Sequence, residues 1–452
     1  MSIKDIGYLD YFGAKCIYIQ DEMDYVLMPA DEESNIQRHF MDENYLLTFS
    51  DNINKHCVVS VKKQLGSGSH HIRLGLNYIY KGISDEAIDG FIMKGNEIDE
   101  FFSPLEYYFR QKRQNEYSPK DLLYEQDIIS HYMFECCGKN VEVELVYGNI
   151  LTEGIRTDLT MHPQLIVKFD STHDTDFVFL LSSVIIKLLQ LVHRKTSYNI
   201  NKFELFHRTD KGISNIGYMF SSLYNKDYRA NARIEASFML YKGKISNLLS
   251  MIAGEDAFPL SHLCPSIEQS YKYTSERLGA ISSAFEYEYE RSKEYPHTSE
   301  LECHDVKKSI LDFIDQIQST GAEVSKFKEQ AKNNIGKIGT QLGLKAKIQN
   351  AYSINAGALS SSLPFLLGRL KTIEHVASIF PRLRGKVLHQ EMGYEFNDDE
   401  IECIRFIEIL QYVMVLRRAE YTDKEIEVIL GALYYCNEAY MKQIMAESTE
   451  SH

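Results

Sequence analysis

The 452-residue chain has eight cysteines, but no two of them are spaced as CxxC. This absence excludes the usual zinc frameworks and disulfide scaffolds, so reduced thiols in a cytoplasmic compartment are expected. The chain has no GxxxxGK[ST] segment either, which argues against an NTP-driven machine. The first residues lack the apolar core of a signal peptide, and the longest apolar stretch, residues 177–192, contains Lys187 and Gln190. We therefore expect a soluble cytoplasmic protein that makes no membrane contact.

Acidic residues outnumber basic ones, and the formal net charge is −15. This balance disfavours a protein whose whole surface coats nucleic acid, so any contact with nucleic acid must come from a local basic patch. The hydrophobic content of 44% and the charged content of 25% are ordinary for a folded protein. The length predicts about two to three domains.

The first half of the chain is predicted to be rich in strands. In residues 71–80 apolar side chains recur at every second position, which is typical of a half-buried strand. Residues 57–61, 141–147 and 165–169 are rich in branched and aromatic side chains and predict further strands. Residues 177–193 predict one helix with an apolar stripe that packs on the sheet.

The second half has helical periodicity, with breaks predicted at several glycines and prolines, among them Pro381. Residues 309–338 predict a long polar helical stretch. Asn397 and Glu400 form a capping box, which opens an amphipathic helix with one apolar side. A further helix is expected after Thr422.

These patterns predict an α+β fold class, in which a strand-rich N-terminal half precedes an all-α helical bundle. We assign residues 1–255 to an α+β sensor or regulatory domain with room for two subdomains. Residues 256–452 are assigned to the helical domain, with the boundary between residues 250 and 266.

The most informative segment for function is Pro-Arg-Leu-Arg-Gly-Lys-Val-Leu-His, residues 381–389. Arg384 and His389 are separated in it by four residues. An arginine stays cationic and presents a planar fork to a phosphate, whereas a histidine can take and give protons near neutral pH. Together the two side chains can cut RNA without a metal, so no metal and no cofactor are expected.

The spacing alone is weak evidence, because three other pairs in the chain are separated by five residues: Arg156 and His162, Arg291 and His297, and Arg369 and His375. The context is more informative. Between residues 369 and 389 there are five basic side chains and one acidic one, Glu374, within an acidic chain. This segment is therefore a local patch of the kind that RNA binding requires.

The spacing also raises a geometric difficulty. Residues five apart on an ideal helix lie about 140° apart around its axis. Arg384 and His389 would act together only at a distorted turn, which Gly385 would permit, or in a site built from two chains.

At these residues the sequence resembles the HEPN superfamily of ribonucleases, whose signature is an arginine followed after four to six residues by a histidine, at a junction of two helices. Residues 416–426 are similar to the continuation of HEPN domains. Residues 278–286 resemble the first HEPN helix of the ApeA-like anti-phage family. Residues 89–95 and 97–104 are similar to part of the β-rich N-terminal domain in that family.

The resemblance implies a metal-independent endoribonuclease of an abortive-infection system, in which two HEPN domains pair and bring two motifs into one cleft. His389 would act as general acid and base, and Arg384 would stabilise the charge on the phosphate. Arg382 also fits the spacing and is the alternative arginine. Lys386 and Glu286 are expected to assist, with Glu286 facing the cleft. RNA, a second copy of the chain and an unidentified phage or host trigger are the implied partners.

One residue departs from the family pattern. The position after the motif arginine is usually polar in that family, often Asn or Asp, whereas here it is Gly385.

Other interpretations stay open at this point. Arg384 and His389 could merely end a helix and bind its last carbonyl groups. The helical domain could keep the HEPN shape for dimerisation or RNA binding without catalysis. A third possibility is a structural partner with no role towards nucleic acid, which a buried ion pair at Arg384 would support. Glu286 would then belong to a solvated acidic face together with Glu288 and Glu290.

Three further clusters have simpler explanations. His70 and His71 predict an exposed hairpin, because adjacent strand residues point to opposite faces. His173, Asp174 and Asp176 predict a polar loop before a helix. The run Cys303-His304-Asp305 contains the residue types of a catalytic triad, but such triads are assembled in space rather than in sequence.

Overall fold

The computed structural model divides into two compact units, Met1–Ser270 (unit 1) and Tyr271–His452 (unit 2). The division falls after the expected interval of 250–266, because the short helix α6 (Ile267–Ser270) still belongs to the first unit. The structure describes residues 5–434 with the exception of 22, 31–43, 52–54, 69–70, 84–85, 103–127, 150–160, 199, 201, 211, 222–237, 256–257, 297–303, 319–320, 338–341, 368–369, 371 and 391–393. A strand-rich antiparallel N-terminal half and a helical C-terminal half are both present, as the sequence predicts.

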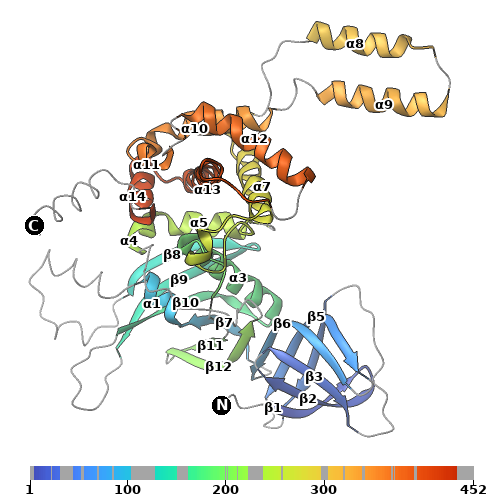
Figure 1. Ribbon diagram of the computed structural model, residues 1–452. Coiled ribbons are helices and arrows are strands. Elements are labelled where there is room, and N and C mark those ends of the chain that lie inside the picture. The colour runs from blue at the N-terminus through green and yellow to red at the C-terminus, as the bar shows by residue number, and fades with distance from the viewer. Residues whose placement is uncertain are drawn as a thin grey trace, which may run out of the picture. The chain divides into compact units, whose positions relative to one another are not determined.

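Unit 1 is built on an antiparallel sheet with the strand order β1-β2-β3-β6-β12-β11-β7-β10-β9-β8, and β4 and β5 pair beside β6 (Figure 1). The strands are β1 (Asp5–Tyr11), β2 (Ala14–Asp21), β3 (Asp24–Pro29), β4 (Tyr45–Ser50), β5 (His56–Gly68), β6 (His71–Gly82), β7 (Ile88–Met93), β8 (Ile128–Cys136), β9 (Lys139–Asn149), β10 (Met161–Thr172), β11 (Lys202–Thr209) and β12 (Gly212–Ser221). The four strand predictions are confirmed, within β6, β5, β9 and β10.

Apolar side chains form the interior of this unit in two described regions. Strands β1 to β6 enclose one core, in which Tyr18 and Tyr25 stack with their ring centroids 5.5 Å apart. Further apolar side chains are buried under helix α3 (Thr175–His193), where the rings of Phe177 and of Phe169 on β10 meet edge to face with their centroids 5.3 Å apart. The predicted helix at 177–193 is thus confirmed.

Helix α3 is the one helix among the described residues that is long and apolar enough to cross a bilayer, and 67% of that apolar window is buried inside the protein. A mostly buried core helix passes the same test of length and hydropathy, so α3 is only weak evidence for a membrane segment. Among the described residues of unit 1, the shorter helical elements are α1 (Asn96–Phe101), α4 (Phe238–Tyr241), the 3₁₀ turn η1 (Lys242–Lys244), α5 (Ile245–Ala253) and α6 (Ile267–Ser270).

Unit 2 is helical, and α13 runs through its middle against α7, α10, α11, α12 and α14. Its helices are α7 (Ser275–Arg291), α8 (His304–Gln316), α9 (Ala322–Lys337), α10 (Leu344–Leu359), α11 (Leu363–Leu367), α12 (Ile373–Gln390), α13 (Asp398–Arg418) and α14 (Asp423–Tyr434). The predicted capping box at the start of α13 is confirmed, since Asn397 and Glu400 bond each other's backbone N–H groups. The helix expected after Thr422 is also confirmed.

Two expectations about these helices are wrong, and the first concerns α13. This helix is buried on almost every side rather than on one apolar face, because helices pack around it. The predicted helical stretch 309–338 is largely helical: parts of α8 and α9 form it, and these two helices pack against each other.

The chain does not break at Pro381, which lies inside α12. A proline in a helix interior costs about 3 kcal/mol or more. The burial of Phe380, Leu383 and Val387 on the same helix opposes that cost. The Arg–His segment therefore lies within one continuous helix rather than at a junction of two.

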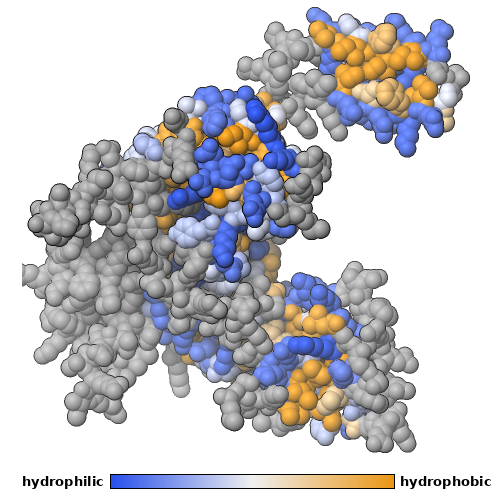
Figure 2. Space-filling model, viewed as in Figure 1, coloured by the Kyte–Doolittle hydropathy of each residue, from blue (hydrophilic) through white to orange (hydrophobic). Residues whose placement is uncertain are grey.

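Helices α8 and α9 carry large apolar side chains that stay exposed, and Figure 2 shows apolar atoms spread over both of them. Val306, Ile310 and Phe313 follow one another along α8, and Phe327 lies on α9; Phe313 is 68% exposed and Phe327 is 66% exposed. These side chains form an apolar surface that the rest of the described chain does not bury.

Candidate functional site

The basic segment occupies the C-terminal half of α12. Leu383 and Val387 are buried, whereas Arg382 and Lys386 are exposed and Arg384 is half-buried. Position 389 lies in the last turn of the helix, but the side chain of His389 lies outside the described residues. The helix therefore presents its cations to solvent while its apolar side anchors it in unit 2.

Because α12 is continuous, helical geometry fixes which positions share a face. Seven residues turn about 700°, which is only about 20° short of two full turns, so positions 382 and 389 lie on one face about 10 Å apart along the axis. Position 386 lies on that same face. Position 384 lies about 140° away from 389 around the axis. The arginine on the face of position 389 is thus Arg382, and Arg384 lies on another side of the helix.

The other side of α12 brings Arg384 to α7. Its Nη2 atom lies 2.9 Å from Oε2 of Glu286, and both side chains are about one third exposed. Lys347 on α10 approaches the same helix, with Nζ 3.9 Å from Oε1 of Glu286 and 2.6 Å from Oε1 of Glu290. Glu286 therefore lies between two cations and compensates the charge of Arg384.

Glu286, Glu288 and Glu290 of α7 do not form one solvated face. Glu288 is buried, and its two carboxylate oxygens accept hydrogen bonds from Arg418 on α13, both at 2.9 Å. Glu286 and Glu290 point instead to the cations of α12 and α10. The structure thus brings Glu286 to Arg384, and it makes Glu288 part of the helix packing.

Lys386 is tied to the start of α13. Its Nζ donates a hydrogen bond to the hydroxyl of Tyr394 at 2.7 Å and lies 4.2 Å from the centre of that ring. The same hydroxyl donates to Glu400, the residue of the capping box, at 3.0 Å. Arg382, in contrast, has no ion-pair partner among the described residues, so its guanidinium is the most accessible one on α12.

Gly385 has no positive φ and lies within α12, and a Cβ added to it would meet no atom within 4 Å other than those of its chain neighbours and of the adjoining helix backbone. It therefore does not distort the helix to bring Arg384 to position 389. The explanation in which Arg384 only binds terminal carbonyls also fails, because this residue lies more than a turn before the helix end and pairs with Glu286.

The other sequence clusters have structural roles where they are described. Asp174 caps α3 by accepting a hydrogen bond from the backbone of Phe177 at 3.0 Å, and Asp176 accepts one from the hydroxyl of Tyr78 at 2.8 Å. His71 begins β6 and is exposed. His70, Cys303 and the side chain of His304 lie outside the described residues.

The described thiols of four cysteines are poor nucleophiles. Burial raises the pKa of Cys57 to about 11, and the pKa values of Cys136 and Cys403 to about 12. It raises the pKa of Cys16 as well. These thiols stay protonated at neutral pH, so thiolate chemistry is not expected at them.

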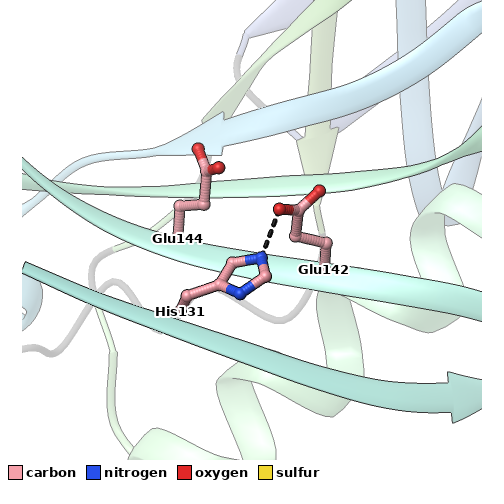
Figure 3. A group of neighbouring side chains, drawn as sticks. All are labelled: His131, Glu142 and Glu144. Atoms are coloured by element: carbon pink, nitrogen blue, oxygen red, sulfur yellow. Dashed lines mark hydrogen bonds and ion pairs between the residues drawn. The ribbon is translucent and has the colours of Figure 1, made fainter. Parts of the chain in front are cut away.

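Two features of the structure escaped the sequence analysis. The first is Lys347, whose place in the site follows only from its contacts with Glu286 and Glu290 of α7. The second is a group of three side chains in unit 1, His131, Glu142 and Glu144, whose potential metal-binding atoms lie within 4.8 Å of one another (Figure 3). The alternation of Glu142 and Glu144 along one strand was the signal available in the sequence.

No family model matches the chain, and no curated protein and no solved structure matches it either.

Proposed function

We propose that unit 2 is a metal-independent endoribonuclease of the HEPN type, which acts as a homodimer in an anti-phage abortive-infection response in the cytoplasm. Unit 1 would sense the phage or host trigger. The observation that carries the proposal is the cationic face of α12, where exposed Arg382 and Lys386 share one side of a continuous helix with position 389.

In this proposal each side chain has a separate task. Arg382 and Lys386 hold the RNA phosphate, with Arg382 presenting its planar fork. His389 takes the proton of a ribose 2′-hydroxyl as this oxygen attacks the adjacent phosphorus. His389 of one of the two copies in the dimer returns a proton to the leaving 5′-oxygen. The P–O5′ bond breaks and leaves a 2′,3′-cyclic phosphate. Because α12 is continuous, Arg382 rather than Arg384 lies on the face of position 389, and we propose Arg382 as the phosphate-binding arginine.

Arg384 has a different part in the proposal. Glu286 neutralises it in the single chain, so it reaches RNA only if that ion pair opens. Pairing of two chains, or a signal from unit 1, would separate Arg384 from Glu286. This arrangement suits an enzyme whose basal activity is low and rises on infection.

The second candidate is a catalytically inactive HEPN-like module for dimerisation or RNA binding. The Arg384–Glu286 ion pair favours it, because that contact gives Arg384 a structural role. The exposed apolar side chains of α8 and α9, which include Phe313 and Phe327, also favour an interaction module. In this alternative the protein binds RNA or itself, and the RNA stays intact.

The deciding experiment compares His389→Ala with His375→Ala. His375 is an exposed histidine on the same helix, so it is a matched control. Purified full-length variants are incubated with single-stranded RNA in EDTA, and their toxicity on overexpression is scored. The enzyme predicts that His389→Ala abolishes cleavage and toxicity whereas His375→Ala keeps both. If wild type and His389→Ala behave alike in both assays, catalysis at this site is refuted and the binding module is favoured.

A further inference from the structure

The hairpin of β8 and β9 in unit 1 places three potential metal ligands together. Its two-residue turn consists of Cys137 and Gly138, both with positive φ (51° and 74°), as tight hairpins require. This turn fixes the register, so that His131 on β8 lies directly opposite Glu144 on β9. Glu142 follows on the same face, two residues from Glu144 along the strand.

The three side chains share the face of the hairpin opposite to its apolar one. Val141, Val143 and Leu145 alternate with the two glutamates and are buried. Figure 3 shows His131, Glu142 and Glu144 projecting from the same side of the two strands and converging. Glu144 is buried, Glu142 is half-buried and His131 is exposed, so the group is open to solvent on the side of His131.

Each of the two carboxylate groups contacts one basic side chain. Nε2 of His131 is in contact with a carboxylate oxygen of Glu142, and Lys168 on β10 forms an ion pair with Glu144. Two carboxylate groups, those of Glu142 and Glu144, thus lie side by side, an arrangement that a cation stabilises.

We propose that His131, Glu142 and Glu144 form a binding site for a divalent metal ion of the zinc class. One nitrogen and two carboxylate oxygens from a rigid hairpin match the three protein ligands of an open zinc site, in which a fourth position stays free for water. The imidazole favours zinc over magnesium or calcium, which prefer oxygen ligands alone. This site belongs to unit 1 and does not rest on the proposed ribonuclease.

Lys168 gives the proposal a specific consequence. Its ammonium group competes with a metal ion for Glu144, so the ion must displace it or share that carboxylate with it. Replacing Lys168 by methionine keeps the length of the side chain and removes its charge. The metal site therefore predicts tighter zinc binding in Lys168→Met, whereas a self-contained ion-pair network predicts no zinc binding in any variant.

The test is a competition between the full-length protein and a chromophoric chelator for Zn²⁺, with Mg²⁺ as the comparison ion. Wild type is expected to bind one equivalent of Zn²⁺ and to ignore Mg²⁺, and Lys168→Met is expected to bind Zn²⁺ several-fold more tightly. His131→Ala and Glu142→Gln are expected to lose that equivalent. Both positions are at least partly exposed, so these variants avoid the buried Glu144 and are expected to fold.

The matched control is His207→Ala, because His207 also pairs with a carboxylate: its Nδ1 lies 2.8 Å from Asp89. Among the described residues, however, it belongs to no group of three ligands as close as those of the proposed site. His207→Ala is expected to bind Zn²⁺ as wild type does. The proposal is overturned if wild type binds no Zn²⁺, or if His131→Ala and Glu142→Gln retain the bound equivalent.

Discussion

The ion pair between Glu288 and Arg418 predicts a large effect of a single substitution on the stability of unit 2. It joins α7 to the central helix α13, and its side chains are 1% and 17% exposed. Glu288→Ala leaves the guanidinium of Arg418 largely buried without its two 2.9 Å hydrogen bonds to this carboxylate. Breaking a buried pair in this way costs about 3–5 kcal/mol, because one desolvated charge remains. For a unit of this size the loss corresponds to a decrease in Tm of roughly 6–20 °C.

The assay is urea and thermal unfolding of full-length variants, followed by far-ultraviolet circular dichroism. Glu290→Ala is the control, because Glu290 pairs with Lys347 but is 55% exposed, and a surface pair contributes only about 0–1 kcal/mol. The double variant Glu288→Leu with Arg418→Met should recover most of the lost stability, since apolar residues of similar volume replace buried pairs well. If Glu288→Ala lowers the free energy of unfolding by less than about 1 kcal/mol, as the control does, the claim that this buried pair stabilises unit 2 is refuted.

Three further predictions concern other residues. Gly385→Ala should stabilise the protein by about 0.5–1 kcal/mol in urea unfolding, because the site is helical and open; a destabilised variant would show that this glycine is needed. Arg382→Ala should weaken RNA binding in fluorescence anisotropy and lower the slope of its salt dependence by about 1, whereas Arg384→Ala, already neutralised by Glu286, should change it less; equal effects would contradict the assignment of faces on α12. Burial lowers the pKa of His193 from 6.5 to about 3, so between these two pH values the unfolded chain binds this proton and the folded chain does not. Urea unfolding should therefore show the free energy of unfolding falling by about 1 kcal/mol between pH 6.5 and 5.5, with a flatter profile in His193→Gln. Identical profiles for the two proteins would refute His193 as the origin of the effect.

Local sequence signals predicted several elements well. The alternation in residues 71–80 predicted β6, and the apolar residues near 177–193 predicted α3, because each pattern reports on its own element. The capping box of Asn397 and Glu400 predicted the first residue of α13, since its bonds are made within one turn. These features depend on neighbours in the chain and were therefore accessible without a structure.

Features that depend on packing were not accessible in the same way. Pro381 predicted a break, but the buried residues on both sides of it keep α12 continuous. That continuity changes the candidate site, because it separates Arg384 from the face of position 389 and places Arg382 on it. The contact of Arg384 with Glu286 joins two helices far apart in the sequence, so only the folded bundle brings the two residues together.

The metal-ligand group illustrates the same limit. Glu142 and Glu144 alternate on a predicted strand, which is also the pattern of any solvated strand face. Only the register set by the two-residue turn brings His131 opposite Glu144. The sequence alone shows two acidic residues on one strand. The structure places a histidine beside them, and its imidazole nitrogen makes the group suitable for zinc.

The most direct test of the central claim is the chemistry of the RNA ends after incubation with the full-length protein in EDTA. Mass spectrometry of the fragments should show 2′,3′-cyclic phosphate and 5′-hydroxyl ends for wild type and for His375→Ala. His389→Ala should give intact RNA. Intact RNA with wild type, or cyclic-phosphate ends that persist in His389→Ala, would contradict the proposal that the cationic face of α12 is a ribonuclease site.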